Sequence, residues 1–131
     1  STASSPALAQ ALLASMDIIE GAEGRQRRAH LQALVAQWQH SSLGDCWQRL
    51  ASATAIQPLI VGSNAAVMRL AASLRARGLW VPAIRPPTVP AGTARLRVTL
   101  TSAHTHEQVQ TLTVALAQLS QIETTQPETG A

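Results

Sequence analysis

The sequence of 131 residues contains no lysine, and its ten basic residues are all arginines. Covalent chemistry that needs a lysine amine is therefore excluded for this chain alone. The arginines are scattered from Arg25 to Arg97, and only Arg25, Arg27 and Arg28 lie close together. The net charge of +3 thus comes without a basic stripe, which argues against nucleic-acid binding.

Cysteine and aromatic residues are also scarce. Cys46 is the only cysteine, which excludes an internal disulfide and fits a reducing, cytoplasmic compartment. Phe and Tyr are absent, so the core must be built from Leu, Val, Ile and Ala, with Trp38 and Trp80 expected inside it.

Long apolar runs and a targeting segment are missing as well. No run approaches the roughly 20 residues that span a bilayer, so we expect no membrane association. Ser1 to Ser5 carry no basic cluster and do not resemble a secretory signal. A hydrophobic content of 46% with 13% charged residues is typical of one folded globular domain.

The first part of the chain predicts two helices. Ser5 is a suitable N-cap and Pro6 a suitable first helical residue, and apolar residues recur at helical spacing up to Gly21. A second helix is expected to begin near Glu23 and to bury one apolar stripe. That stripe consists of Leu31, Leu34, Val35 and Trp38. Residues 41–55 show no clean period and are interpreted as a connection.

From Ile56 the pattern changes to strands. Ile56 to Gly62 is a short apolar run that predicts a buried strand. Asn64 is expected to cap a helix that ends at Gly78. The buried face of that helix is expected to hold Val67, Leu70, Ala71 and Leu74. Leu79 to Ile84 predicts a second strand, and a loop with three prolines follows it.

The clearest strand is Ala94 to Thr101, in which apolar and polar residues alternate. Leu96, Val98 and Leu100 are expected to face the core, and the polar residues between them, with two arginines, to face away from it. Thr105 and Gln108 have the spacing of a capping box, which predicts a final amphipathic helix. Its buried residues are expected to be Val109, Leu112, Leu116 and Leu119.

These elements predict an α+β fold, with a short, mostly antiparallel sheet, helices on one face, and two lead-in helices before it. We divide the chain into a helical lead-in segment (residues 1–45), an α+β small domain (residues 46–122) and a disordered tail (residues 123–131).

One stretch carries a specific resemblance. Ile84 to Arg97 reads Ile-Arg-Pro-Pro-Thr-Val-Pro-Ala-Gly-Thr-Ala-Arg-Leu-Arg. It resembles the C-terminal signature of the α-oxoamine synthases, which are pyridoxal-phosphate-dependent enzymes of fold type I. Ile56 to Gly62 is similar to the first small-domain strand of that family, and Ser1 to Leu12 to the segment after its cofactor lysine. The resemblance extends to about Leu119 and covers about the last third of the family's length.

The opening Ile-Arg-Pro-Pro-Thr-Val-Pro is most similar to the 8-amino-7-oxononanoate synthase branch of that family, which acts in biotin synthesis. The resemblance implies a homodimeric, cytoplasmic acyltransferase that condenses L-alanine with a pimeloyl thioester, with loss of carbon dioxide. The thioester would be carried by coenzyme A or by acyl carrier protein. The cofactor, pyridoxal 5'-phosphate, would be bound as a Schiff base to a lysine that this chain lacks, so the chain alone is predicted to be inactive.

The same resemblance implies roles for particular residues. Arg97 matches the arginine that grips the substrate carboxylate, and Thr88 matches a threonine at the substrate site. Ser1 and Thr2 match a pair that reaches the cofactor phosphate of the partner subunit. Arg95 has no such match and is interpreted as structural, paired with a carboxylate.

Other functions compete with this hypothesis. A stand-alone regulatory module could use Arg97 to bind a carboxylate without catalysis. An RNA-binding module is less favoured, because no Trp is expected on the face of Arg95 to Thr101. His104 and His106 could be a metal pair, but two ligands do not complete a zinc site, so we favour a role at the helix entry. Cys46 has no acid-base partner nearby in sequence to make it a nucleophile.

Overall fold

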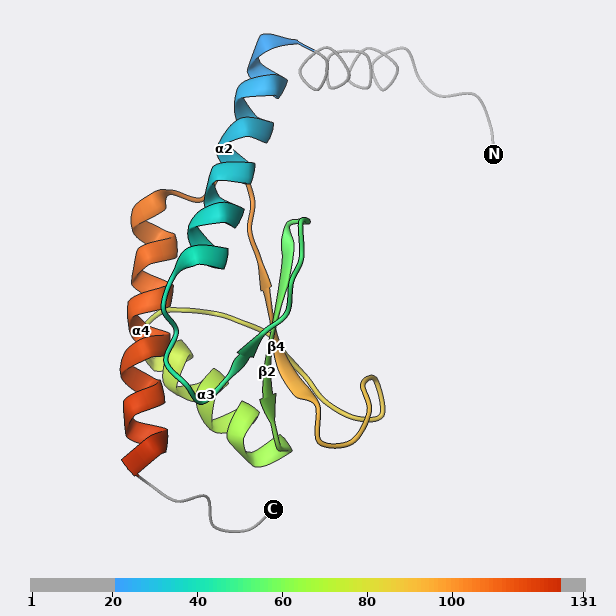
Figure 1. The fold of residues 1–131 in the computed structure, drawn as a ribbon, viewed down its shortest axis with the longest axis vertical. Coiled ribbons are helices and arrows are strands. Elements are labelled where there is room, and N and C mark those ends of the chain that lie inside the picture. Colours follow the sequence, from blue (N-terminus) through green and yellow to red (C-terminus); the bar gives the residue numbers. More distant parts are fainter. Residues whose placement is uncertain (1–20, 126–131) are drawn as a thin grey trace.

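The computed structural model describes residues 21–125, which form three helices beside a four-stranded sheet (Figure 1). Neighbouring strands are antiparallel, in the order β1-β2-β4-β3, and the helices lie on one side of the sheet. This arrangement confirms the α+β prediction. The first of the two lead-in helices lies outside the described residues. The elements are α2 (Ala22–His40), β1 (Gln48–Arg49), β2 (Ile56–Gly62), α3 (Asn64–Ala76), β3 (Ala83–Ile84), β4 (Ala94–Thr99) and α4 (His106–Thr125).

The core lies between the sheet and the helices. In β4 and just after it, Leu96, Val98 and Leu100 are buried, while Arg97 and Thr99 are exposed, as the alternation predicted. Leu59 of β2 stands opposite Leu96 in the sheet register, and both are fully buried. Burial of a leucine side chain contributes roughly 1.5–3 kcal/mol. The helices contribute to the core the buried residues that the sequence predicted for them. These are Leu34, Val35, Trp38, Val67, Leu70, Ala71, Leu74, Val109, Leu112, Leu116 and Leu119.

One polar side chain is also completely buried on this face of the sheet. The amide of Gln57 donates to the carbonyl oxygens of Ser52 (3.0 Å) and Thr54 (2.7 Å). Its own carbonyl oxygen accepts from the amide of Gln39 on α2. Because each polar atom of Gln57 has a partner, its burial is compatible with a stable core.

The ends of α3 differ slightly from the prediction. Ser63, not Asn64, is the N-cap, and its hydroxyl accepts from the backbone N–H of Ala66 at 3.1 Å. Asn64 is the first helical residue. At the other end Gly78 adopts a positive φ of 81°, and its N–H donates to the carbonyl of Arg75. The N–H of Leu79 returns to the carbonyl of Leu74, which completes a Schellman motif.

The helix α4 begins as predicted and ends later than predicted. Thr105 and Gln108 form a reciprocal capping box, with N–H to side-chain distances of 3.1 and 3.0 Å. The helix continues to Thr125, so Glu123 is helical and does not belong to a disordered tail. Its carboxylate accepts two hydrogen bonds of 3.2 Å from Arg69 on α3. This ion pair joins the last turns of α4 to α3.

Two strand predictions need correction. The predicted strand Leu79 to Ile84 is reduced to Ala83–Ile84, because Leu79 still bonds to α3 and Pro82 has no N–H to donate. The carbonyl of Pro82 nevertheless accepts from Arg97 N at 2.9 Å. The connection 41–55 contains a strand, β1, that pairs Gln48 with Ile60. Two residues are too few to show an alternation in the sequence.

The connection before β1 is anchored to α4 through a glycine. The hydroxyl of the buried Ser120 accepts from the N–H groups of Asp45 (3.1 Å) and Cys46 (3.2 Å). Gly44 lies directly against this serine with a φ of 86°. A Cβ atom at Gly44 would lie 2.2 Å from Ser120 Oγ. The close approach of loop and helix therefore requires glycine.

We predict that Gly44→Ala destabilises the protein more than Gly78→Ala. Both glycines have a positive φ, which costs an alanine roughly 1–2 kcal/mol. A Cβ at Gly78 would meet no atom within 4 Å, whereas at Gly44 it would displace Ser120. Free energies of unfolding from urea titrations measure the difference. Equal losses for the two variants would contradict the role of the contact with Ser120.

Candidate functional site

The face of the sheet opposite the helices carries the residues that the sequence singled out. Because side chains alternate along a strand, Arg95, Arg97 and Thr99 of β4 point away from the core. Pro58 of β2 stands opposite Arg97, and Ile60 stands opposite Arg95. The two guanidinium groups thus emerge from a surface that is otherwise largely apolar.

Arg97 has a fixed backbone and a free head group. Its N–H donates to the carbonyl of Pro82, and β4 holds it between β2 and β3. The side chain is exposed, and within residues 21–125 its guanidinium forms no hydrogen bond or ion pair. A guanidinium in this state offers a planar pair of donors to a carboxylate.

Arg95, two residues earlier, is bound to the protein itself. Its guanidinium donates to the carbonyl oxygen of Thr93 at 3.1 Å and to the hydroxyl of Thr93 at 3.2 Å. The half-buried side chain thus braces the end of the loop that precedes β4. Arg95 is structural, as predicted, but its partner is a threonine and not a carboxylate.

Thr88 lies on the loop from Arg85 to Thr93, which projects beyond the paired ends of β3 and β4 (Figure 1). Its N–H donates to the carbonyl of Arg85 at 3.1 Å, and Thr93 closes a second turn by bonding to the carbonyl of Pro90. These turns leave the side chain of Thr88 exposed. No hydrogen bond joins the side chains of Thr88 and Arg97 in the part of the chain that the structure describes.

The other predicted site residues, Ser1 and Thr2, lie outside the described residues.

A cleft of about 450 Å³ opens beside Arg97, and sequence reasoning missed one of its residues. Trp80 lines the cleft and is 75% exposed, so its expected place in the core is wrong, whereas Trp38 is fully buried as predicted. Trp80 directly follows Leu79, the last residue bonded to α3, which places it at the sheet edge. The guanidinium carbon of Arg75 lies 4.7 Å from the centre of its ring.

This placement also corrects an argument against nucleic-acid binding. The sequence placed no tryptophan near the face of Arg95 to Thr101, yet Trp80 shares a cleft with Arg97 and Thr99. The sequence carried no signal for this, because residues 80–83 are Trp, Val, Pro and Ala and show no alternation of apolar and polar side chains.

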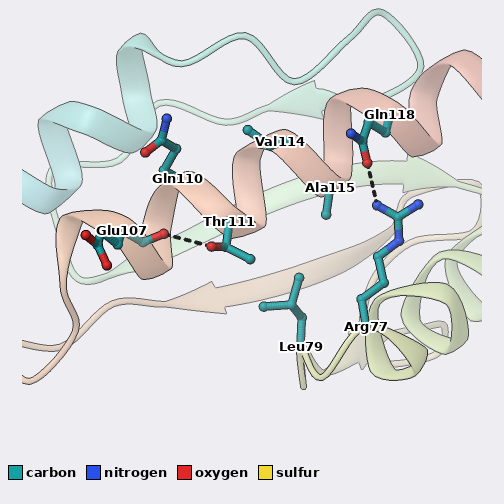
Figure 2. Close-up of a pocket in the computed structure, with 8 residues that line it drawn as sticks. All are labelled: Arg77, Leu79, Glu107, Gln110, Thr111, Val114, Ala115 and Gln118. Carbon is teal, nitrogen blue, oxygen red and sulfur yellow. Dashed lines mark hydrogen bonds between the residues drawn. The ribbon is translucent and has the colours of Figure 1, made fainter.

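A second hollow, of about 560 Å³, lies between the end of α3 and the outer side of α4 (Figure 2). Leu79, Val114 and Ala115 give it apolar walls. Its only cation, Arg77, is already bonded to Gln118 at 2.8 Å. No residue that the sequence predicted for a site lies there, so we assign the site to the cleft beside Arg97.

The histidines have structural partners. His104 Nδ1 accepts from the N–H of Thr101 at 2.9 Å, and the carbonyl of His104 accepts from His30 at 2.6 Å. His106 bonds through its ring and its carbonyl to the amide of Gln37. Within residues 21–125 no three His, Cys, Asp or Glu side chains gather as a metal site would need. The histidines join the start of α4 to α2, as the helix-entry role predicted.

Arg49 is a structural arginine that the sequence did not reveal. It donates to the carbonyl oxygens of Gln39 (2.6 Å) and Ser41 (2.5 Å), and its guanidinium carbon lies 5.5 Å from the centre of the Trp38 ring. Loss of water around the guanidinium lowers the pKa of Arg49 from its usual value. Arg49 thus ties the end of α2 to β1.

No helix in the described range 21–125 is long and apolar enough to cross a membrane.

Known proteins match this chain along most of its length. Residues 1–116 match the family described as Aminotransferase class I and II. The chain is 61% identical over 120 residues to the 8-amino-7-oxononanoate synthase of Janthinobacterium sp. (strain Marseille). This match covers 92% of the chain and 30% of that protein. It is 57% identical over 119 residues to the 8-amino-7-oxononanoate synthase of Bordetella petrii, covering 91% and 30%. The chain therefore spans about 30% of the length of these curated relatives.

Solved structures agree with the fold. The 8-amino-7-oxononanoate synthase of Francisella tularensis superposes with a TM-score of 0.70 at 22% identity, over 94% of this chain and 35% of that one. This likeness concerns the fold alone. A serine palmitoyltransferase of Sphingomonas wittichii superposes with a TM-score of 0.63 at 27% identity, over 77% of this chain and 26% of that one.

We predict that Arg97→Ala changes stability by less than about 0.5 kcal/mol, because the exposed guanidinium has no partner to lose. Arg49→Ala is the matched comparison, and the loss of its hydrogen bonds is expected to cost about 1–3 kcal/mol. Urea unfolding of the two variants measures both values. A loss for Arg97→Ala as large as that for Arg49→Ala would show that Arg97 is structural.

Proposed function

Because this chain belongs to the class I and II aminotransferase family, we propose that it is the C-terminal part of a pyridoxal-phosphate-dependent 8-amino-7-oxononanoate synthase. The reaction joins L-alanine and a pimeloyl thioester to give 8-amino-7-oxononanoate, carbon dioxide and a free thiol. Identities of 61% and 57% to synthases of that name support the proposal, and so does the signature Ile84 to Arg97.

The free guanidinium of Arg97 is the observation on which the proposal depends. An exposed arginine with no hydrogen-bond or ion-pair partner among residues 21–125, on an inner strand of the sheet, is suited to bind the carboxylate of the amino-acid substrate. Holding that carboxylate fixes the direction of the bond between it and the α-carbon. That bond is broken in the reaction, so Arg97 acts by positioning.

Thr88, on the loop beyond β3 and β4, is proposed to donate a hydrogen bond from its hydroxyl to the substrate. The loop is restricted by Pro86, Pro87 and Pro90, which limit the backbone freedom that would be lost on binding. Its two turns leave the hydroxyl without a partner among the described residues.

The residues of this chain do not provide the covalent link to the cofactor. The sequence has no lysine, so the link to pyridoxal 5'-phosphate must come from residues outside this chain. When bound, the cofactor supplies the electron sink for the carbanion at the α-carbon. We propose that Ser1 and Thr2 reach the cofactor phosphate of the partner subunit in a homodimer, and that the chain alone is inactive. Residues 1–45 would belong to the large domain and residues 46–122 to the small domain of this cytoplasmic enzyme.

Arg97→Ala in the full-length protein should lower kcat/KM for L-alanine roughly a hundredfold or more, since two charge-assisted hydrogen bonds are lost. Arg97→Lys should recover only part of the activity, because an ammonium cannot form the paired contact. Release of carbon dioxide and thiol measures the reaction. Arg77→Ala, which removes an arginine bound to Gln118, is the control and should leave kcat/KM unchanged.

A folded, cofactor-loaded native protein that releases neither carbon dioxide nor thiol would refute the proposed reaction. The carboxylate-binding regulatory module would then become the preferred hypothesis.

Thr88→Val should lower kcat/KM by about tenfold or less, the effect of one neutral hydrogen bond. Valine keeps the shape of threonine, so a loss of activity would report the hydroxyl and not the loop. Thr111→Val, at an exposed threonine of α4 that does not line the cleft beside Arg97, is the control. Unchanged activity in Thr88→Val would remove Thr88 from the site.

A further inference from the structure

The guanidinium of Arg95 reaches back along the chain into the loop that carries Thr88. Its Nε donates to the carbonyl oxygen of Thr93 at 3.1 Å, and its Nη2 donates to the hydroxyl of the same residue at 3.2 Å. That hydroxyl donates in turn to the carbonyl oxygen of Pro90 at 2.6 Å. A continuous series of hydrogen bonds therefore runs from β4 into the loop and ends at the residue after Val89, close to Thr88 in sequence.

This series of hydrogen bonds fixes the second of the two turns in the loop. The first turn is closed by the backbone of Thr88 and Arg85, as described above. The second is closed at the carbonyl oxygen of Pro90, which accepts from both the N–H (3.1 Å) and the hydroxyl of Thr93. Gly92 lies inside this turn with a φ of 79°. Because glycine has wide backbone freedom, the shape of the turn depends on the hydrogen bonds that close it.

The arginine that begins the series is held by the sheet. The backbone of Arg95 lies between Ile60 of β2 and Ile84 of β3, and its side chain is half-buried. Thr88, in contrast, lies on a loop, where a functional group is placed less accurately than on a strand. Arg97 needs no such support, because it lies on β4 itself. The hydrogen bonds of Arg95 thus connect the less fixed candidate site residue to the strand of the more fixed one.

We propose, resting on the function proposed above, that Arg95 and Thr93 are positioning residues that act through Thr88. Their hydrogen bonds fix the second turn, and the turn holds the hydroxyl of Thr88 at one place relative to Arg97. Without them the loop populates further shapes, and only a fraction of the molecules presents the hydroxyl to the substrate. The contribution of the two residues to catalysis therefore cannot exceed that of the Thr88 hydroxyl itself.

The test measures kcat/KM in the full-length, cofactor-loaded protein. Thr93→Val removes the hydroxyl and keeps the shape, and it should lower kcat/KM about three- to tenfold, within the effect of Thr88→Val. Thr93→Ser keeps the hydroxyl and should restore activity close to the native value. Arg95→Lys keeps the positive charge, but an ammonium does not reproduce the two planar donors, so kcat/KM should fall by a factor similar to that of Thr93→Val.

A double-mutant cycle separates positioning from a general structural role. If Thr93 acts through the hydroxyl of Thr88, the double variant Thr88→Val/Thr93→Val should have the same kcat/KM as Thr88→Val alone. The same holds for Arg95→Lys combined with Thr88→Val. Arg49→Lys is the matched control, since Arg49 also donates to backbone carbonyl oxygens but joins α2 to β1. It should show no coupling to Thr88→Val.

Effects that multiply in the double variants would overturn the proposal, because Arg95 and Thr93 would then act on folding or on the reaction in general. Equal losses in Thr93→Val and Thr93→Ser would also overturn it, since the hydroxyl would not matter. So would native activity in Arg95→Lys, because the charge and not the hydrogen-bond geometry would then suffice. Full activity in Thr88→Val would refute this inference and leave the proposed reaction intact, whereas a native protein that releases neither carbon dioxide nor thiol would refute both.

Discussion

The alternation of side chains along β4 is the constraint on which the rest of the structure depends. The strand lies inside the sheet, between β2 and β3, so its backbone is hydrogen-bonded along both edges. Every second residue must then enter the core, and the residues between them must leave it. The same backbone therefore sets the packing of Leu96 against Leu59 and the direction of Arg97. Core and candidate site cannot be displaced independently of each other.

The arginines show how one residue type serves two purposes in this fold. The guanidinium groups of Arg49 and Arg95 form hydrogen bonds within the protein, to carbonyl and hydroxyl oxygens that need partners. Within residues 21–125 the guanidinium groups of Arg75 and Arg97 form no hydrogen bond or ion pair. Arg75 stacks on the Trp80 ring, and Arg97 lines a cleft with mainly apolar walls. A free guanidinium beside an apolar wall attracts an anion that also has a hydrocarbon part. The partner of each arginine, and not its position in the sequence, thus separates structural from binding roles.

Much of the fold could be predicted because local patterns and tertiary packing agree. The alternation of Leu96 and Val98 with arginines, and the spacing of Thr105 and Gln108, each determine a structure over a few residues. Features that depend on distant residues were missed. The strand β1 is defined by its pairing with Leu59 and Ile60, and the last turns of α4 contact α3 through the ion pair of Glu123 and Arg69. Trp80 was misplaced for a related reason, since a tryptophan is usually buried but the edge of the sheet turns this one outwards. For the candidate site, the signature singled out Arg97 and Thr88, but only the structure could show that the guanidinium of Arg97 has no hydrogen-bond or ion-pair partner among the described residues.

The loop from Arg85 to Thr93 begins and ends at the same rung of the sheet, because Ile84 pairs with Arg95. Changes in the length or composition of the loop therefore need not alter the pairing of Ile84 with Arg95, and β4 keeps its register in the sheet. Natural variation or laboratory selection could reshape the loop that carries Thr88 while Arg97 on β4 stays in place. The fold thus separates a segment that can vary from a strand that must remain constant.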